Sequence, residues 1–353
     1  MLKVSYFKNS SKSVPVICSL ALALCCISPA QADTTYPIAV TTYTYTDLFM
    51  NHMRNSIHKY CKQEQVQCVF FDGDNNEKTQ MDFVNSKINE NMAVAVAPVE
   101  PTSQNKPIIN SANNQKVPSI LFNRGLNPED LKNKKQAWYV ASRESDVGLF
   151  QGQMIEEYLK THKDWDKNGN GKLDILLFKG AKDHYSVKIR TDRVLEYLEK
   201  AGIEYDIVEE FNCDWLFENG YSSMKEYLGG NALEDIEMII SNNDDMALGA
   251  IAAMDDIRVE LDSSEEIYVP VVGVDGVKDA ISAVAHGQML GTVLQDSDEM
   301  SKIIVLTASG KVKNAKELSE VTGHPYKSRY VLVPYKKIDK SVAEDLMKAS
   351  AEK

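Results

Sequence analysis

Nine consecutive residues have the types and the spacing of a calcium-binding loop. The run Asp166-Lys167-Asn168-Gly169-Asn170-Gly171-Lys172-Leu173-Asp174 reads Asp-x-Asn-x-Asn-Gly-x-x-Asp, which matches the opening part of an EF-hand-type loop. A hard cation needs several oxygen atoms at one point, and alternate side chains along a tight turn supply them. The predicted ligands are Asp166, Asn168, Asn170, Asp174 and the backbone carbonyl oxygen of Lys172.

The loop lacks the acidic residue that normally completes such a site. An EF-hand loop carries a bidentate Glu at its last position, but Leu177 stands there, inside the apolar run Leu173–Phe178. The loop therefore leads into a buried strand rather than a helix, and any further ligand must come from another part of the chain. A surface turn rich in Asn and Gly that binds nothing is the alternative.

The N-terminus has the composition of an export signal. Three lysines precede the apolar stretch 14–27, and Ala30-Gln31-Ala32 forms a cleavage site before Asp33. The apolar stretch is too short to span a bilayer, and no later segment reaches the roughly 20 apolar residues of a membrane helix. We therefore expect a signal peptide over residues 1–32 and a periplasmic mature protein over 33–353.

Charge and cysteine content narrow the classes of partner. The chain carries 39 Lys and Arg against 51 Asp and Glu, a net charge of −12, and loss of the three leader lysines makes it more acidic. This balance argues against binding to nucleic acid or anionic membranes. In an oxidising compartment, Cys61 and Cys68 could form a disulfide, with Cys213 left free. The histidines are scattered and no Cys-x-x-Cys occurs, which argues against zinc.

Strands and helices alternate along almost the whole mature chain. Continuous apolar runs such as Pro-Ser-Ile-Leu-Phe at 118–122 are typical of buried parallel strands, and amphipathic stretches lie between them. This alternation predicts an α/β fold of parallel sheets with helices on both faces, and about 320 mature residues are enough for two such domains. The series runs twice, with a break near residues 141–145. The charged tail over 339–353 is expected to be loose.

Polar and aromatic residues follow the expected strands at their carboxyl ends, where open parallel sheets bind ligands. Asp47, Asn243 and Asp275 would each also suit a helix N-cap, which is the alternative reading for single positions. The residues at these strand ends are Asp47, Phe49, Asn123, Arg124, His184, Ser186, Arg190, Asp214, Trp215, Asn242, Asn243, Asp244, Asp275, Gln295 and Asp296.

This set suits a small, neutral, polyhydroxylated ligand. Carboxylate, amide and guanidinium groups pair with hydroxyls, and the C–H faces of a sugar lie flat on rings such as Phe49 and Trp215. No Gly-x-Ser-x-Gly, phosphate loop or nucleotide-binding Gly-x-Gly-x-x-Gly is present, so we do not expect an enzyme. His184 and Ser186 are too close in sequence to favour a nucleophile pair.

The sequence resembles the type I periplasmic sugar-binding proteins, specifically the glucose- and galactose-binding members that serve ABC transport and chemotaxis. The resemblance covers nearly the whole mature chain. The stretches that carry it are 45–50, 122–123, 165–174, 177–180, 241–244, 273–275, 291–294 and 333–335.

The resemblance implies a role for each of these site residues. Phe49 and Trp215 would sandwich the sugar ring, and Glu237 would supply the carboxylate that the calcium loop lacks. The residues that would bond hexose hydroxyls are Asp47, Asn123, His184, Arg190, Asn243 and Asp275. Two further positions depart from the family: Ser186 stands where it has an Asp that bonds the sugar, and Gln295 where it has an Asn.

The resemblance also implies two lobes joined by three hinge strands, with residues 33–142 and 295–323 in the first lobe and 143–294 and 324–353 in the second. Sugar would bind between them and close the hinge. The expected partners are a monosaccharide, the membrane subunits of an ABC transporter and a chemoreceptor, for a protein that is itself a monomer with structural Ca²⁺. Another small sugar, such as a pentose, another hexose or a furanose signal, is the first alternative. A sugar-responsive transcription regulator and an exported enzyme are more distant ones.

Overall fold

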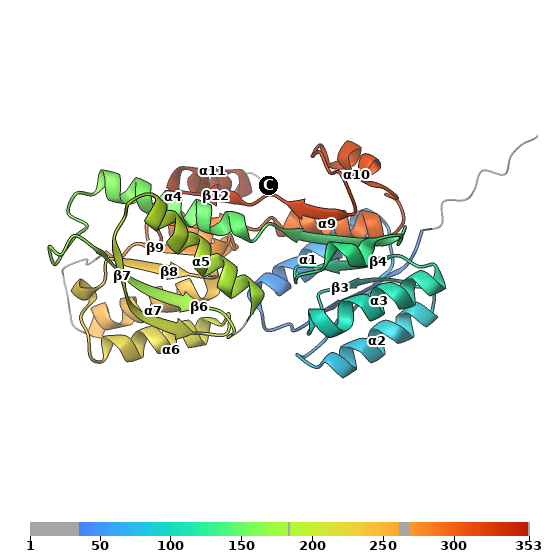
Figure 1. Ribbon diagram of the computed structural model, residues 1–353, viewed down its shortest axis with the longest axis horizontal. Helices are drawn as coiled ribbons and strands as arrows, with labels where there is room; N and C mark the ends of the chain where they lie inside the picture. The colour runs from blue at the N-terminus through green and yellow to red at the C-terminus, as the bar shows by residue number, and fades with distance from the viewer. Residues whose placement is uncertain (1–34, 183, 261–267, 352–353) are drawn as a thin grey trace, which may run out of the picture. The chain divides into compact units, whose positions relative to one another are not determined.

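The computed structural model describes residues 35–182, 184–260 and 268–351. It confirms an α/β fold with two sheets, each covered by helices on both faces (Figure 1). Both sheets lie in one unit, Thr35–Lys353. The expected signal peptide over 1–32 lies outside the described residues.

The first sheet is parallel throughout, in the order β11-β5-β4-β3-β1-β2. Helices α1 and α9 cover one face and α2 and α3 the other, with α10 at the edge of the α9 side. The strands are β1 (Ile38–Thr42), β2 (Cys68–Asp72), β3 (Ala93–Val96), β4 (Ser119–Phe122), β5 (Ala137–Ser142) and β11 (Tyr330–Val333). The helices are α1 (Leu48–Gln63), α2 (Glu77–Asn89), α3 (Pro101–Gln115), α9 (Ser297–Ala308) and α10 (Ala315–Thr322), with the short η1 (Pro128–Leu131).

The second sheet has the order β12-β10-β9-β8-β6-β7, and only its edge strand β12 is antiparallel. Helices α4 and α5 cover one face, and α6, α7, α8 and α11 the other. The strands are β6 (Leu173–Lys179), β7 (Tyr205–Asn212), β8 (Met238–Ser241), β9 (Val271–Asp275), β10 (Gly291–Leu294) and β12 (Lys336–Ile338). The helices are α4 (Ser145–Thr161), α5 (Tyr185–Lys200), α6 (Phe217–Leu228), α7 (Asp244–Glu260), α8 (Lys278–Ala285) and α11 (Lys340–Ala351), with the short η2 (Leu233–Asp235).

The central strands are apolar because both of their faces are covered. In β6, Leu173, Ile175 and Leu177 pack under α4 and α5, while Leu176 and Phe178 pack under α6 and α7. Side chains of a strand alternate between its two faces, so a strand between two helix layers needs apolar residues at every position. This explains the continuous apolar runs that predicted a parallel sheet.

The chain crosses between the two sheets three times, and each crossover is two residues long. The crossovers are Arg143-Glu144 between β5 and α4, Gln295-Asp296 between β10 and α9, and Pro334-Tyr335 between β11 and β12. The third crossover corrects one expected lobe boundary. We expected residues 324–353 in the second lobe, but β11 pairs with β5 in the first sheet, and only the chain from β12 onward joins the second.

Several elements escaped the sequence analysis. The tail over 339–353, expected to be loose, forms α11 up to Ala351 and packs against α8. Helix α3 was missed because Pro107 lies inside it and its buried face includes the polar Gln104 and Asn105. Strands β5 and β12 and helix α10 were also not predicted.

The structure contains the disulfide Cys61–Cys68, and Cys213 is a buried free thiol. The disulfide joins the last turn of α1 to the first residue of β2. A disulfide stabilises the folded state mainly by restricting the unfolded chain, and the loop that this one closes is short.

We predict that replacing both Cys61 and Cys68 with Ser lowers the free energy of unfolding by about 2 to 3 kcal/mol, the loop-closure value for a loop of this length. Urea denaturation of the oxidised protein measures it. A reducing agent should destabilise the wild type similarly and leave the double variant unchanged. If reduction had no effect on the wild type, the disulfide would not contribute to stability.

Candidate functional site

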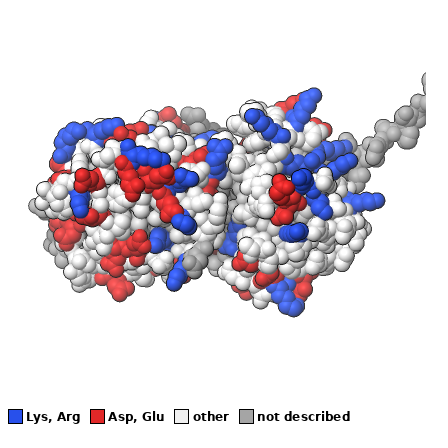
Figure 2. All heavy atoms as spheres, viewed as in Figure 1, with Lys and Arg blue, Asp and Glu red and all other residues white. Residues whose placement is uncertain are grey.

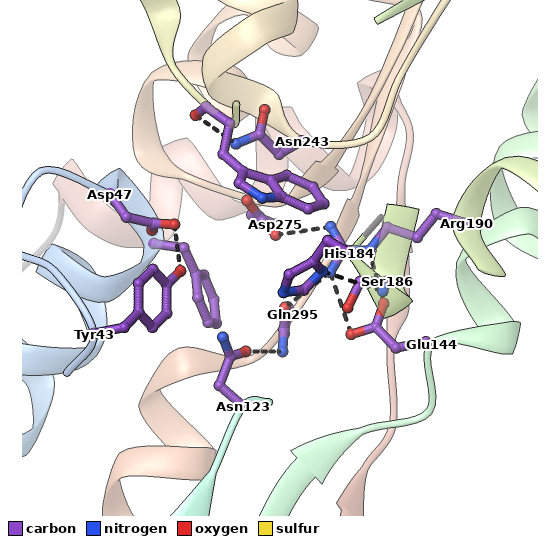
Figure 3. A pocket seen from close by; sticks show the side chains of 12 residues that line it. Tyr43, Asp47, Asn123, Glu144, His184, Ser186, Arg190, Asn243, Asp275 and Gln295 are labelled. Atoms are coloured by element: carbon purple, nitrogen blue, oxygen red, sulfur yellow. Dashed lines mark hydrogen bonds and ion pairs between the residues drawn. The ribbon is translucent and has the colours of Figure 1, made fainter. Parts of the chain in front are cut away.

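All ten residues predicted to bind ligand line one pocket at the strand ends (Figure 3). Each sheet contributes side chains, and the crossovers form part of the lining. The lining residues are Tyr43, Asp47, Phe49, Asn123, Glu144, His184, Ser186, Arg190, Trp215, Asn243, Asp275 and Gln295. The other polar strand-end residues, Arg124, Asp214, Asn242, Asp244 and Asp296, do not line it.

Sequence reasoning missed two lining residues, Tyr43 and Glu144. Glu144 follows β5, so the strand-end rule would have found it had β5 been recognised. Tyr43 lies directly after β1, and its hydroxyl donates to Asp47 Oδ2 at 2.5 Å. Its place in a run of Thr and Tyr gave no separate signal.

Asp47 both caps a helix and lines the pocket. Its Oδ1 accepts a hydrogen bond of 2.8 Å from the Met50 backbone N–H in the first turn of α1, and its Oδ2 accepts from Tyr43. Asn243 is similarly placed: its Oδ1 accepts from the Met246 N–H, and its Nδ2 donates to the Trp215 carbonyl. Capping and ligand binding are therefore not alternatives here, because one side chain has atoms for both.

Three pocket residues have a positive φ although none of them is glycine. The values are 64° at Asn123, 69° at Trp215 and 114° at Asp275. Asn adopts this region more readily than most residues, but Trp and a φ of 114° are uncommon. Such conformations cost about 1 to 3 kcal/mol each and persist where the surroundings enforce them, often at functional sites.

Arg190 is the charged centre of the pocket. Its Nε donates to Glu144 Oε2 at 2.7 Å, its Nη1 donates to the Asn242 carbonyl at 2.6 Å, and Asp275 Oδ1 lies 3.6 Å from Nη1. Its Nη2 also reaches Gln295 Oε1 at 3.5 Å and the Tyr335 hydroxyl at 3.3 Å. One guanidinium thus contacts all three crossovers. Burial raises the pKa of Asp275 well above its usual range, and nearby Arg190 opposes this shift.

His184 is neutral at physiological pH. Burial lowers its pKa to about 4, and the positive charges of Arg124 and Arg190 act in the same direction. Its Nδ1 accepts from the Ser186 backbone N–H at 3.2 Å, so its Nε2–H is left as a donor. The imidazole also packs edge-on against Trp215, with ring centroids 5.3 Å apart.

The cavity enclosed by these side chains is small. Its volume is about 40 Å³, room for roughly three water molecules. A sugar ring needs more space than this, so it can be accommodated only if the lining residues move apart. The three short crossovers allow such a movement as a rotation of one sheet relative to the other.

The predicted calcium loop lies between α4 and β6, and Glu237 meets it from the residue before β8. Glu237 Oε1 accepts from the Lys167 N–H at 2.5 Å and its Oε2 accepts from the Asp174 N–H at 3.1 Å. Burial raises the pKa of Glu237, the hydrogen bonds from the Asp174 and Lys167 N–H groups oppose this shift, and the charges of Asp174 and Asp166 add to it. The predicted ligand Glu237 is therefore adjacent to the loop, as the resemblance implied.

The oxygen atoms of the loop itself are turned toward backbone N–H groups. Asp166 accepts from Gly169 and Gly171, and Asn168 and Asn170 each accept from the residue two positions later. Asn168 Nδ2 also donates to Asp174 Oδ2 at 2.6 Å. Within the described part of the chain, no three or more His, Cys, Asp or Glu residues are grouped as a metal site. The donor set is nevertheless all oxygen and includes a buried carboxylate close to two others, which fits a hard divalent cation.

Two helix-covered sheets, parallel except for the edge strand β12, with a polar pocket at their strand ends, are the architecture of a two-lobed solute-binding protein. The sequence profile of the periplasmic binding protein domain matches residues 38–316, and the chain belongs to this family. The D-galactose/methyl-galactoside binding periplasmic protein MglB of Haemophilus influenzae is 31% identical over 313 residues, which cover 88% of this chain and 92% of that protein. The xylitol-binding protein of Mycolicibacterium smegmatis is 26% identical, covering 78% and 72%.

Solved structures agree on the fold. An ABC transporter solute binding protein from Bacillus halodurans, with bound myo-inositol, has a TM-score of 0.68 at 24% identity and covers 90% of this chain and 99% of that one. The protein is thus a periplasmic solute-binding protein and not an enzyme. No helix within residues 35–182, 184–260 and 268–351 has the length and apolar character of a membrane span.

We predict that His184 makes the folded protein less stable as the pH falls from 6.5 toward 4. In this range the unfolded chain protonates this histidine at its ordinary pKa, whereas the folded protein, with a pKa of about 4, does not. Protons therefore favour the unfolded state, and the stability present above pH 6.5 is progressively lost.

The measurement is the melting temperature against pH for the wild type and His184→Gln. The variant should show a shallower decline between pH 6.5 and 4 than the wild type. Equal slopes for the wild type and His184→Gln would contradict the prediction.

Proposed function

We propose that the protein binds a hexose, glucose or galactose, in the pocket of Figure 3 and delivers it to the membrane subunits of an ABC transporter. The observation that carries this proposal is that one cavity contains two aromatic residues from different lobes, Phe49 on α1 and Trp215 after β7, together with several groups able to bond hydroxyls. The similarity to a protein named for binding D-galactose and methyl-galactoside supports the choice of hexose.

The polar groups of the pocket match what a monosaccharide presents. Sugar hydroxyls donate to carboxylates and accept from charged or amide donors, and the pocket offers both. Asp47, Glu144 and Asp275 supply acceptors, and Arg190 and the His184 Nε2–H supply donors. The amides of Asn123, Asn243 and Gln295 can do either, which suits hydroxyls because these donate and accept at once.

Closure of the lobes would couple binding to delivery. Arg190 contacts all three crossovers, so a sugar that bonds this guanidinium would influence the segments about which the lobes rotate. A closed, sugar-bound form would differ in shape from an open, sugar-free form. The membrane subunits could therefore bind the closed form in preference to the open one. We extend the proposal to a chemoreceptor that recognises the same closed form.

Charge on the surface fits a protein partner rather than nucleic acid. On the face shown in Figure 2, acidic and basic side chains are interspersed and no broad basic surface is present. The formal net charge of −12 agrees with this.

The main alternative is another small sugar or polyol. Relatives are named for binding xylitol and, at 23% identity over 90% of this chain, for ribose import in Bacillus subtilis. Ser186 stands where the glucose- and galactose-binding proteins have an Asp, so one charge-assisted hydrogen bond, worth about 1.5 to 3 kcal/mol, is missing here. This difference favours testing pentoses and polyols beside hexoses.

We predict that calorimetric titration of sugar-free protein shows glucose or galactose binding more tightly than ribose or xylitol. Trp215→Ala should weaken binding of the preferred sugar by at least about 2 kcal/mol, which is roughly 30-fold in Kd, because the change removes one of the two stacking faces. Phe217→Ala, which removes a partly exposed aromatic outside the pocket, is the matched control. Tighter binding of ribose or xylitol would replace the hexose proposal with the alternative.

We also propose that Ca²⁺ binds at the loop 166–174 and stabilises it. Asp166, Asn168, Asn170, Asp174, the Lys172 carbonyl and Glu237 would hold the ion. Bound calcium would supply positive charge beside Glu237, a buried residue close to Asp166 and Asp174. The loop side chains would have to exchange their hydrogen bonds to backbone N–H groups for the ion.

We predict that a calcium chelator lowers the melting temperature by several degrees, since an ion at a thousand times its Kd stabilises the folded state by about 4 kcal/mol. Scanning calorimetry with calcium and with chelator measures the difference. Asp166→Ala should abolish this calcium-dependent difference, whereas Asp164→Ala, an exposed acid just outside the proposed set, should retain it. A wild-type melting curve that is the same in chelator would refute the site.

A further inference from the structure

A second, much larger cavity adjoins the sugar pocket. Its volume is about 770 Å³, within the range of about 300 to 1,000 Å³ that is typical of small-molecule sites. The two cavities share four lining residues, Asn123, Glu144, His184 and Ser186. The larger cavity, here called the side groove, is therefore next to the pocket, and these four residues form a shared wall.

Three tyrosines gather along the side groove. Tyr139 on β5 and Tyr330 on β11 have ring centroids 4.6 Å apart, and Tyr185 begins α5 on the other sheet. Burial raises the pKa of Tyr139 and of Tyr330, and the nearby Tyr185 phenol adds to both shifts. Tyr185 is 61% exposed, so packing inside the protein does not account for its aromatic ring. An exposed aromatic face beside a sugar pocket is suited to stacking against a ring of the ligand.

The rest of the side groove is mixed in character. Val99, Leu126 and Leu332 contribute apolar surface, and Glu100 and Arg143 contribute charge. Sugar rings combine C–H faces with hydroxyl edges, so they fit aromatic surface bordered by charged and polar groups. A purely apolar ligand group would cover these charged groups without offering them a hydrogen bond.

Ser186 lies where the pocket and the side groove meet. It is a short, uncharged side chain that lines both cavities. A carboxylate at this boundary would occupy space and would bond the first ring there. Serine fills less of this boundary, which leaves more room there for a substituent on that ring.

We propose that the side groove is a second sugar subsite, and that the ligand is a hexose linked through a glycosidic bond to a second pyranose ring. The first ring occupies the pocket between Phe49 and Trp215, and the second ring stacks on Tyr185 and Tyr330. This inference rests on the proposed function and specifies its substrate class as a disaccharide.

The test is calorimetric titration of the sugar-free protein with glucose and galactose and with the disaccharides cellobiose, maltose, lactose and melibiose. At least one disaccharide should bind within tenfold of the better monosaccharide, or more tightly. Tyr185→Ala should raise the Kd for that disaccharide at least threefold and change the Kd for the monosaccharide less than threefold. Tyr268→Ala, a partly exposed tyrosine on the second lobe outside both cavities, should change neither.

The outcomes separate the two proposals. If a monosaccharide binds and every disaccharide is more than tenfold weaker, the second subsite is overturned and the hexose proposal stands. If a disaccharide binds but Tyr185→Ala leaves its affinity unchanged, or weakens both sugars equally, the side groove is not its subsite. If none of these sugars binds, the hexose proposal fails and the second subsite fails with it.

Discussion

The buried guanidinium of Arg190 is the interaction on which the arrangement of the site depends. A buried charge is tolerated only when it is paired and its hydrogen bonds are made, and here the partners come from separate crossovers: Glu144 from the first, Gln295 from the second and Tyr335 from the third. Removal of one member of such a buried pair commonly costs about 3 to 5 kcal/mol, because the other charge is left uncompensated. The same residue thus orders the pocket and holds the three connecting segments to the second lobe.

Around this charge, the other ionisable groups of the pocket are shielded by burial or by hydrogen bonds, which would suit a ligand without charge of its own. Asp47, Glu144 and Asp275 outnumber Arg190, but Asp275 has a pKa raised by burial and Glu144 is engaged with the guanidinium. His184 is neutral and presents a donor. Dipolar groups fixed in place discriminate by geometry, since a ligand that lacks one hydroxyl leaves a buried polar group unpaired. The positive φ values at Asn123, Trp215 and Asp275 fit this account, because the backbone is held in costly conformations where orientation matters.

Much of the fold and most of the pocket could be predicted from the sequence, because both follow from one physical rule. Apolar runs marked the parallel strands, and the carboxyl ends of such strands converge, so residues far apart in the chain could be placed together. The rule failed where a strand was not recognised: without β5, Glu144 had no strand end to follow. Helix α3 was hidden by Pro107 and by amides on its buried face. Cavity volumes, the hydrogen bonds within the calcium loop and the three tyrosines of the side groove depend on tertiary packing, which residue types alone do not specify.

The brevity of the crossovers sets what motion is available. Each link is two residues long, and a residue spans at most about 3.6 Å. The two lobes therefore cannot separate by more than this short length of chain allows. The movement that such links allow is a rotation of one lobe relative to the other. Because Glu144 and Gln295 are themselves link residues, they lie beside the pivot and are displaced least when it turns. In such a rotation the side chains of Glu144 and Gln295 would keep their places in the pocket, while lining residues farther from the links would move.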